Sequence, residues 1–471
     1  MILGKKSVLS FVIIFILGTV AILMVNKQYR PFKGYTLFNP LHSPMTYLIN
    51  NQGDVVHTWT SRDLPGLSVY LLENGNLLRA AKQSLPGKPA FVAGGAGGRI
   101  EEFDWDGNLV WQFVYSSAQY RQHHDIEKLP NGNILMIAWE RKRKAEAIAS
   151  GRDPKLIEKD ELWPDHIIEV QPTGSSGGKI VWQWHLWDHL VQEHDPRMKN
   201  YGSVKNHPEL VDINYIGTMA PGAGGADWTH TNAIDYNQRL DQIMISVHGF
   251  NEIWIIDHST NTEEAAGHTG GRYGKGGDLL YRWGNPRAYA AGGIGNQQLF
   301  GQHDAKWIEN GVPGQGHILI FNNGLNREGE GKGYSTVVEI EPPLEAGGNY
   351  SRIPGEEFGP NQTIWTYGPK WMGKFYSAYI SGAQRLPNGN TLICNGPKGN
   401  FFEVTPRGKK VWSYMNRFTQ ENQKSDKLLD YKVFRAERYG VDFPGLKNLK
   451  TLKACLNGFQ ILPANLKNLL W

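Results

Sequence analysis

Three short stretches of the same design decide the fold of this 471-residue chain: LLENGNLL at Leu71–Leu78, LPNGNILM at Leu129–Met136 and LPNGNTLI at Leu386–Ile393. In each, an Asn-Gly turn separates two apolar runs. This is the strongest short-range signal for a β-hairpin, and we expect both turn residues to adopt positive φ. Looser copies begin at Ala233 (AIDYNQRLDQIMI) and at Trp307 (WIENGVPGQGHILI).

A second pattern, a turn followed by a strand that carries a Trp, alternates strictly with the first. One hairpin of each kind makes a four-stranded antiparallel sheet, the unit of a propeller blade. We therefore predict an all-β fold, a six-bladed β-propeller. The stretch around Lys432–Tyr439 is expected to supply the strand missing from the first blade, so that no sheet edge stays open. The Trp hairpins end at Trp59, Trp111, Trp182, Trp283, Trp365 and Trp412.

The composition agrees with a turn-rich β-protein. The chain has 55 Gly and 25 Pro, with 16 Trp, 20 Tyr and 18 Phe, and aromatic residues favour strands. The net charge of +4 is small for this length, which argues against a nucleic-acid binder. The two cysteines, Cys394 and Cys455, cannot make a four-sulfur metal site, and Cys394 is expected to be buried.

An apolar segment precedes the body. Ser7–Val25 carries no charge and follows Lys5 and Lys6, and at helical rise it is long enough to cross a bilayer. A retained transmembrane signal-anchor is favoured over a cleaved signal peptide, which places the body outside the cytoplasm, on the periplasmic or extracellular side. The predicted domains are a tail 1–6, the anchor 7–25, a linker 26–33, the propeller 34–445 and a C-terminal tail 446–471.

Blade spacing is irregular at two places. Arg141–Pro164 and His185–Ala226 are polar, Gly-rich stretches that we predict to be long loops, and such loops are usually functional. Several histidines in or beside them are predicted to lie at the surface: His166, His185, His189, His194 and His207.

Three histidines, which we call the column histidines, share one position relative to the turn hairpins. His124, His230 and His303 each lie seven residues before the Asn of their turn. Because the innermost strand of each blade runs along the central channel, equal offsets place these side chains at one height around the axis. Leu67 and Ser381 occupy the position in the other two hairpins. We predict a functional pocket, where imidazole can act as nucleophile, acid–base group or metal ligand.

Other polar residues belong to the same end of the channel. Asp125 and Asp304 each follow a column histidine and are expected to hold a tautomer or a loop. His248, in ISVHGFNEIWIIDHS, ends a strand and is a candidate substrate-binding group. Arg327, in FNNGLNREG, is a candidate for holding an oxyanion. The alternative is that a His-Asp pair at a blade start only closes hydrogen bonds with the next blade.

Several longer stretches resemble the bacterial, nucleotide-independent arylsulfotransferase family: DWTHTNAIDY, ISVHGFNEIWIIDHS, GQHDAKWIENG and SGAQRLPNGNTLI. The similarity runs from about Gly34 to Gly445. It implies a six-bladed propeller, usually periplasmic, that moves a sulfuryl group from an aryl sulfate ester to a phenol through a sulfated histidine, without a cofactor. By position, His230 matches the histidine of the family's D-W-x-H motif. His303 matches the histidine of the following blade, and Arg327 the arginine downstream of it.

The chain departs from the family at one point. The family's nucleophilic histidine belongs to the next blade, and the segment Tyr376–Gln384 contains none. Tyr379 and Ser381 occupy that neighbourhood as candidate substrate-binding groups. Either another histidine, with His124 or its neighbour His123 first in line, takes the sulfuryl group, or the chemistry differs or is absent.

The catalytic residues predicted for such a transferase are His124, His230, His303 and Arg327, with His123 as a further substrate contact. The expected partners are an aryl sulfate, a phenol and, through the N-terminal helix, a membrane, but no nucleic acid. Two other functions stay open. The three column histidines could bind one zinc or iron ion in a metal-dependent enzyme, or the propeller could be a non-catalytic binding protein. The sequence predicts no oligomeric state.

Overall fold

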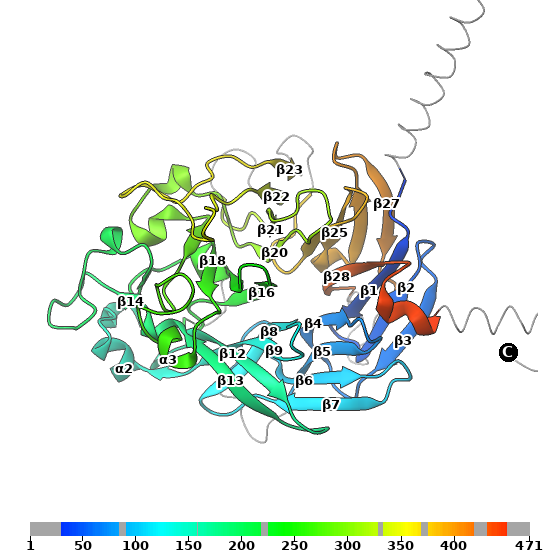
Figure 1. Ribbon diagram of the computed structural model, residues 1–471, viewed down its shortest axis with the longest axis horizontal. Coiled ribbons are helices and arrows are strands. Elements are labelled where there is room, and N and C mark those ends of the chain that lie inside the picture. The colour runs from blue at the N-terminus through cyan, green and yellow to red at the C-terminus, as the bar shows by residue number, and fades with distance from the viewer. Residues whose placement is uncertain are drawn as a thin grey trace, which may run out of the picture.

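The computed structural model describes residues 30–83, 91–157, 159–217, 225–327, 333–368, 375–418 and 431–449. Its main strands form six four-stranded antiparallel sheets that are arranged as blades around a central axis (Figure 1). This confirms the predicted six-bladed β-propeller. The expected membrane segment Ser7–Val25 lies outside the described residues, and no helix within the described ranges is both long and apolar enough to cross a membrane.

Blades 2 to 6 follow the order of the chain, with the innermost strand first. Blade 2 contains β4 (Pro65–Leu71), β5 (Leu77–Lys82), β6 (Gly98–Phe103) and β7 (Leu109–Val114). Blade 3 contains β8 (Tyr120–Lys128), β9 (Ile134–Glu140), β12 (Asp165–Pro172) and β13 (Gly178–His185). Blade 4 contains β16 (Thr231–Asn237), β17 (Gln242–Val247), β18 (Glu252–Asp257) and β19 (Tyr281–Trp283). Blade 5 contains β20 (His303–Trp307), β21 (Ile318–Asn322), β22 (Thr336–Ile340) and β23 (Trp365–Tyr367). Blade 6 contains β24 (Gly382–Arg385), β25 (Thr391–Asn395), β26 (Asn400–Val404) and β27 (Lys410–Met415).

Blade 1 is built from both ends of the body. Its order is β28 (Val433–Gly440), β1 (Gly34–Pro40), β2 (Met45–Ile49) and β3 (Val55–Thr60). The late strand β28 pairs antiparallel with β1, with Gly34 opposite Gly440 and Leu37 opposite Glu437. The predicted strand exchange is therefore confirmed, and it places β28 among the innermost strands (Figure 1).

The three clearest turn hairpins close in a different way from the one expected. Gly75, Gly132 and Gly389 have φ of 84–95°, whereas the Asn before each of them is not left-handed. Each hairpin is a type I turn followed by a left-handed Gly, the usual three-residue loop. The Asn side chain accepts a hydrogen bond from the backbone N–H two residues on, as Asn74 does from Asn76 at 2.9 Å. Asn is thus favoured at this position because its side chain accepts this hydrogen bond, and not because the position requires positive φ.

The six pattern Trp residues all lie on the outermost strand of their blades, and each links its blade to the next. Every indole Nε1–H donates to an oxygen in the outer turn of the following blade, at 2.7–3.2 Å. The series runs around the whole ring and returns to blade 1. The acceptors, in the order of the donors Trp59, Trp111, Trp182, Trp283, Trp365 and Trp412, are Asp104, Gly177, Thr260, Pro360, Pro406 and Asn51.

The two inserted stretches are compact and pack on one another beside blade 3. The first contains β10 (Lys142–Arg143), α2 (Lys144–Ala149), a 3-10 helix at Pro154–Leu156 and β11 (Glu161–Leu162). The second contains 3-10 helices at Leu186–Asp188 and Val204–Asn206, with β14 (Leu190–Val191) and β15 (Val211–Asp212). Arg152 of the first donates to the carbonyl oxygen of Ile213 in the second.

The prediction that the histidines of these stretches lie at the surface is wrong for two of them. His166 is 1% exposed and His189 is 0% exposed, because His166 belongs to a central strand of blade 3 and His189 bonds to Asp278 and the Ala265 carbonyl. His194 and His207 are exposed and His185 is half-buried, as expected.

Short helices elsewhere connect the strands. They are α3 (Thr262–Ala265) and 3-10 helices at His248–Phe250, Pro286–Tyr289, Ile294–Asn296, Gly396–Lys398 and Pro444–Leu446. Cys394 is a buried residue of β25, as predicted, and burial raises the pKa of its thiol. Leu446 and Leu449, placed by the sequence in a C-terminal tail, pack into the core between blades 1 and 2.

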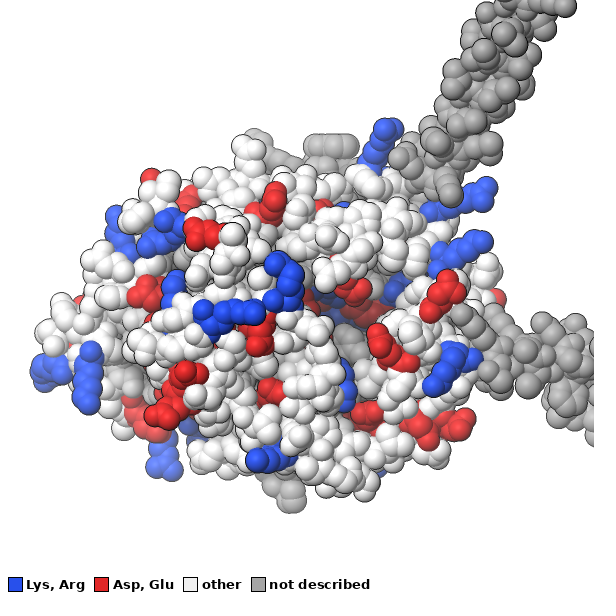
Figure 2. Space-filling view, viewed as in Figure 1, with Lys and Arg blue, Asp and Glu red and all other residues white. Residues whose placement is uncertain are grey.

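Charged side chains of both signs are interspersed over the face seen in Figure 2. No large area of one sign covers this face, in keeping with the small net charge of +4. Such a surface offers little long-range attraction to a polyanion.

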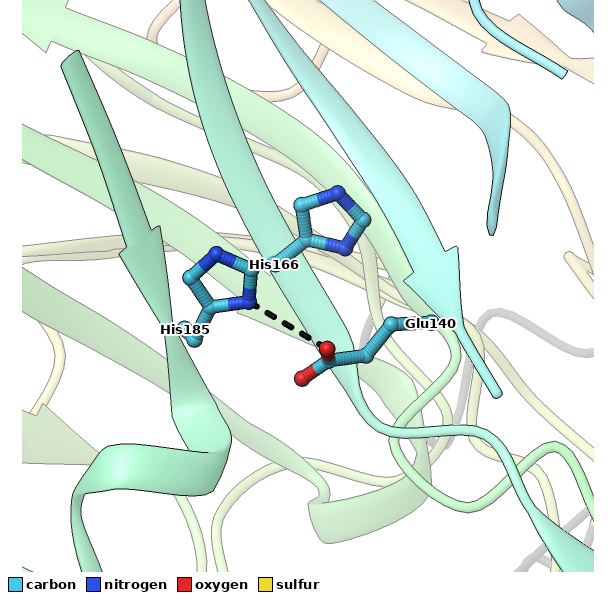
Figure 3. Close-up of side chains that lie close together, drawn as sticks. All are labelled: Glu140, His166 and His185. Carbon is cyan, nitrogen blue, oxygen red and sulfur yellow. Dashed lines mark ion pairs between the residues drawn. The ribbon is translucent and has the colours of Figure 1, made fainter. Parts of the chain in front are cut away.

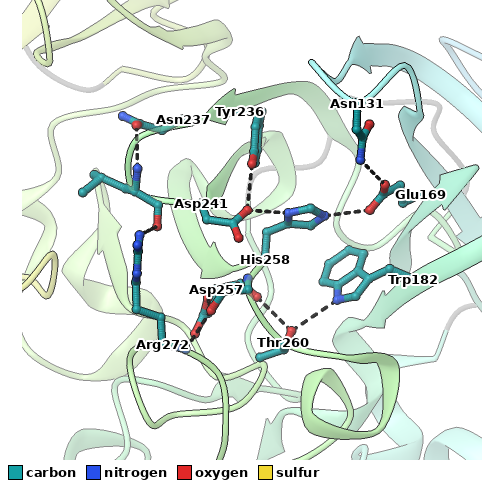
Figure 4. Close-up of polar contacts among 12 residues, drawn as sticks. Asn131, Glu169, Trp182, Tyr236, Asn237, Asp241, Asp257, His258, Thr260 and Arg272 are labelled. Atoms are coloured by element: carbon teal, nitrogen blue, oxygen red, sulfur yellow. Dashed lines mark hydrogen bonds and ion pairs between the residues drawn. The ribbon is translucent and has the colours of Figure 1, made fainter.

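A partly buried ionic contact joins blades 3 and 4. His258 lies between two carboxylates, 2.7 Å from Asp241 and 2.9 Å from Glu169 (Figure 4). Tyr236 donates to Asp241, and Asn131 to Glu169. Burial opposes protonation of the ring, but the two carboxylates raise the pKa of His258 to about 9.

This contact gives the fold a specific dependence on pH. The pKa of His258 is above the unfolded value of 6.5, so its stabilisation is complete below pH 6.5 and is lost as the pH rises to 9. Its full value is about 3 kcal/mol. We expect the free energy of unfolding of the wild type to fall over this range relative to His258→Gln, measured by urea denaturation at several pH values. Parallel curves for the two proteins would contradict the assignment.

Candidate functional site

The residues at the position of the column histidines in each hairpin, which we call the column residues, lie where the inner strands depart from regular β-structure. Leu67, His124, His230 and Ser381 have φ of 110°, 51°, 48° and 87°, and beside His303 it is Asp304 that has positive φ, 51°. The pairing register slips beside these residues in blades 2 to 5. A left-handed non-Gly residue costs about 1–2 kcal/mol, and such strain collects at functional sites.

The column histidines converge as the seven-residue offset predicts. The ring centroids of His124 and His230 are 4.6 Å apart. His248 lies next to His230 at 5.3 Å and next to His303 at 5.4 Å. His123 contacts the other side of His124 at 5.1 Å. Five imidazoles therefore form one continuous chain across the channel, which we call the histidine cluster.

Hydrogen bonds fix the protonation of one end of the cluster. The carboxylate of Asp165 lies 2.9 Å from Nε2 of His123, and Nδ1 of His123 lies 2.8 Å from Nδ1 of His124. The carboxylate can only accept, so a neutral His123 accepts at Nδ1 and His124 donates there. This leaves Nε2 of His124 with a free lone pair. Burial and the neighbouring imidazoles hold the pKa of His124 well below its usual range.

In the middle of the cluster, the pKa of His230 is shifted in the opposite direction. Nδ1 of His230 donates to Asp227 at 2.5 Å, and the other oxygen of Asp227 accepts from the indole of Trp139 at 2.9 Å. Burial opposes protonation of His230, but the Asp227 carboxylate, with Asp165 behind it, raises the pKa of the ring above its ordinary value. An imidazole whose pKa is raised, His230, thus lies beside one whose pKa is lowered, His124.

The far end of the cluster is neutral and hydrogen-bonded to backbone and amide groups. Nδ1 of His303 donates to Asn323 at 2.9 Å, and its Nε2 accepts from the backbone N–H of Ile380 at 3.2 Å. Burial lowers the pKa of His303 to about 4, and burial with the adjacent imidazoles also lowers that of His248. His248 has a buried Nδ1 without a partner among the described residues.

Ser381 and Tyr379, the candidate substrate-binding residues next to the inner strand of blade 6, differ in exposure and contacts. The hydroxyl of Ser381 is fully buried, 2.7 Å from the hydroxyl of Ser377, and accepts from the backbone N–H of Gly396 at 2.9 Å. Tyr379 is 42% exposed. Next to Ser381, Ile380 packs with Leu67 and Phe434, and the ring of Phe434 lies 6.1 Å from that of His124. This side of the cluster is therefore apolar.

The aspartates that follow the column histidines join blades and do not contact the imidazoles through any described hydrogen bond. Asp125 accepts from the backbone N–H of Ile234 in blade 4, and Asp304 from that of Ala383 in blade 6. Arg435 of β28 lies between them, 2.8 Å from Asp125 and 3.1 Å from Asp304. The two aspartates thus make the hydrogen bonds between blades that the alternative interpretation of the His-Asp pairs expects.

Arg327 presents unused donors at a buried position. Its guanidinium stacks on the rings of Phe300 and Tyr334 at 4.8 and 4.4 Å, and Nη1 donates to the Tyr334 hydroxyl. Nε and Nη2 have no partner among the described residues. Gly301, which follows Phe300, lies against Nε2 of His248, so the ring on which Arg327 stacks is next in sequence to a residue that contacts the cluster.

The sequence matches the Arylsulfotransferase (ASST) family over residues 33–439. This chain belongs to the arylsulfotransferase family. It is 23% identical over 392 residues to the arylsulfate sulfotransferase AssT of Escherichia coli O6:H1 (strain CFT073). The aligned region covers 77% of this chain and 59% of that protein. The chain therefore spans about three-fifths of the length of this relative.

Among solved structures, this chain is similar to a protein of unknown function from Bacteroides caccae, with a TM-score of 0.44 and 11% identity over 86% of this chain and 98% of that one. A putative 6-phosphogluconolactonase from Bacteroides fragilis gives a TM-score of 0.38 and 11% identity over 87% and 98%. Likeness at this level does not bear on function.

Some residues that shape the histidine cluster were not predicted. Asp227 lies three residues before His230, so its position beside a histidine was a usable signal. Asp165 and Asn323 lie far from their partners in sequence and gave none. Gly95 is required by close contact, because a Cβ there would lie 2.1 Å from the ring of His124.

Proposed function

We propose that this chain transfers a sulfuryl group from an aryl sulfate ester to a phenolic acceptor through a covalent intermediate on His124. The observation that carries the proposal is the contact between two imidazoles with opposite pKa shifts, His124 with a lowered pKa and His230 with a raised one, at a ring separation of 4.6 Å. Family membership supports the reaction class. Because the chain spans only part of its curated relative, the whole reaction is a proposal.

In the first step, Nε2 of His124 attacks the sulfur atom and the bond from sulfur to the aryl oxygen breaks. The Asp165–His123 pair supports this step, since it holds the Nδ1 proton of His124 and stabilises the positive charge that develops on the ring. His123 is thus a positioning residue behind His124.

Protonated His230 donates its Nε2 proton to the departing aryl oxygen. In the second step the neutral ring takes the proton of the acceptor phenol, whose oxygen attacks sulfur as the bond from sulfur to nitrogen breaks. Arg327 supports the transfer with its two unpaired N–H groups, since sulfuryl transfer, like phosphoryl transfer, spreads negative charge over equatorial oxygens. His248 and His303 complete the binding surface, and Tyr379 is exposed where an acceptor would enter.

The two other functions receive less support. The column histidines are not among the groups of His, Cys, Asp and Glu in the described chain whose ligand atoms lie within 4.8 Å of one another. A binding propeller would not need the opposed pKa shifts of His124 and His230.

The proposal is tested by incubating the full chain with a chromogenic aryl sulfate and a phenol, followed by peptide mapping for covalent sulfate. We expect release of the chromogenic phenol, a sulfated acceptor and label on the peptide that contains His124. Label on a hydroxyl residue, or no transfer at all, would overturn the proposal.

The Asp227→Asn variant should change the pH profile of transfer. His230 acts when protonated, so activity is lost as the pH rises through its raised pKa. Without the carboxylate that pKa falls, and the alkaline limb of kcat/KM against pH should move to lower pH, with a loss of about 100-fold near neutrality. The kinetics of both proteins across the pH range check this, with Asp241→Asn as a control outside the cluster. An unmoved limb would remove His230 from the acid–base role.

We further propose that Ser7–Val25 anchors the chain in a membrane with the propeller outside the cytoplasm. The support is the uncharged apolar run in the sequence. Membrane fractionation and protease protection of intact cells test the anchor and its orientation.

A further inference from the structure

The strands of blade 3 bring together a second group of histidines outside the histidine cluster. Glu140 ends β9, His166 lies in β12 and His185 ends β13. His166 is the direct cross-strand partner of both His185 and Ala138. Since alternate residues of a strand share a face, Glu140 lies on the same face as Ala138, diagonal to His166. The small side chain of Ala138 leaves room between them.

The three side chains lie close together (Figure 3). Their ligand atoms all lie within 4.8 Å of one another. The two imidazole rings are parallel, with centroids 4.9 Å apart, and Nδ1 of His185 is 3.3 Å from Oε2 of Glu140. Ligand atoms on a tetrahedral zinc ion, at bonds of about 2.0–2.1 Å, are about 3.3 Å apart, so small side-chain rotations are enough to close the site.

Two atoms of this group have unused lone pairs in buried positions. Nδ1 of His166, a residue that is 1% exposed, has no partner among the described residues, and neither has Oε1 of Glu140. The other nitrogen of His166, Nε2, is 2.9 Å from the hydroxyl of Tyr115. When Nε2 donates to that hydroxyl, Nδ1 is left as a fixed, unprotonated ligand, as in metal sites where an outer partner orients the histidine.

We propose that Glu140, His166 and His185 bind one divalent transition-metal ion of the class that takes two imidazoles and a carboxylate, such as zinc. Three protein ligands leave one position for water, and the half-buried His185 provides the path to solvent. Lys142, whose ammonium is 3.0 Å from Oε2 of Glu140, competes with the ion for the carboxylate.

The position of the site indicates its role. The first inserted stretch leaves blade 3 directly after Glu140, and the second begins at His185. His166 follows Asp165, which holds His123 and so the proton on His124. An ion here fixes the points at which both inserted stretches leave blade 3, at Glu140 and His185, and the end of β12 that carries Asp165. The site does not depend on the proposed transfer reaction.

A second group, His189, His268 and Asp278, also meets the distance criterion. Both nitrogens of His189 already have protein partners, Asp278 and the Ala265 carbonyl. It offers no free buried ligand atom and serves as a comparison.

The test is zinc binding to the full chain after treatment with a chelator, measured by competition with a chromogenic chelator and by thermal unfolding. We expect one equivalent of zinc and a rise in Tm. Glu140→Gln and His185→Ala, which avoid the buried His166, should each weaken binding at least about 100-fold and lose the rise in Tm. His194→Ala and His268→Ala should bind as the wild type does, and Lys142→Gln should bind more tightly.

Circular dichroism before the titration establishes that each variant is folded. The proposal is overturned if the wild type takes up no stoichiometric zinc, or if Glu140→Gln and His185→Ala bind it unchanged. Loss of zinc only in His268→Ala, or only in a variant of the histidine cluster, would place the ion elsewhere and would equally overturn it.

Discussion

Replacing His124 with Ala should lower the rate of sulfuryl transfer at least about 1,000-fold and abolish covalent sulfate on the protein, because the proposed carrier is gone and water or phenol must attack the ester directly. His230, His303 and Arg327 are still present, so binding of the ester should persist. The expected pattern is a large fall in kcat with a small change in KM, measured with a chromogenic aryl sulfate.

The left-handed backbone conformation of His124 requires a second variant as a control for local backbone change. Its φ of 51° is left-handed, a conformation that Asn adopts more readily than Ala. His124→Asn should therefore keep the bulge and lose the same activity, which separates loss of the nucleophile from a local change of backbone.

The same assay on Ser381→Ala decides between imidazole and hydroxyl carriers. Ser381 bonds to Gly396 and Ser377, so this variant should retain label once its folding has been verified. Loss of label only in Ser381→Ala would rule out a histidine carrier. Full activity in variants of His124, His230, His303 and Ser381 alike would remove the cluster as the site.

Replacing Arg435 with Met should destabilise the propeller by about 3–5 kcal/mol, the usual effect of removing one partner of a buried ion pair. Arg435 is 4% exposed and lies between Asp125 and Asp304 at the centre of the ring. Lys306, 3.2 Å from Asp304, still compensates that carboxylate. Asp125 would keep only the Tyr70 hydroxyl and two backbone N–H groups.

A second substitution tests whether the uncompensated charge causes the loss. Asn at position 125 can still accept from the backbone N–H of Ile234 but carries no charge. Arg435→Met with Asp125→Asn should therefore be more stable than Arg435→Met alone, by about 2 kcal/mol in urea denaturation. If the double variant is no more stable than the single one, packing of the Arg435 side chain and not its charge supports the ring.

The fold was predictable because its signals are local. The turn hairpins and the outer-strand Trp residues fix the number of blades, and the strand missing from blade 1 indicated the exchange with β28 before the structure was known. The seven-residue offset predicted that His124, His230 and His303 meet, since spacing along a strand determines height in the channel. The membrane segment and the functional roles of these residues stay predictions.

What the sequence did not reveal are contacts between distant segments. Asp165 reaches His123 from another strand, and His166 meets Glu140 only because β9 and β12 pair. His166 and His189 were predicted at the surface from their polar surroundings in the sequence. His166 is buried because β12 is a central strand of blade 3, and His189 because the second inserted stretch, which has no periodic signal, brings it against Asp278.

The late position of β28 in the chain affects the order of events during synthesis. A ribosome makes blades 2 to 6 before it makes Val433–Gly440, so nascent blade 1 has an unpaired inner edge at β1 until β28 has been made. Phe434, beside His124, and Arg435, between Asp125 and Asp304, arrive with that last strand. The apolar side of the histidine cluster and the cation between Asp125 and Asp304 are therefore absent until this last strand of the ring has been made.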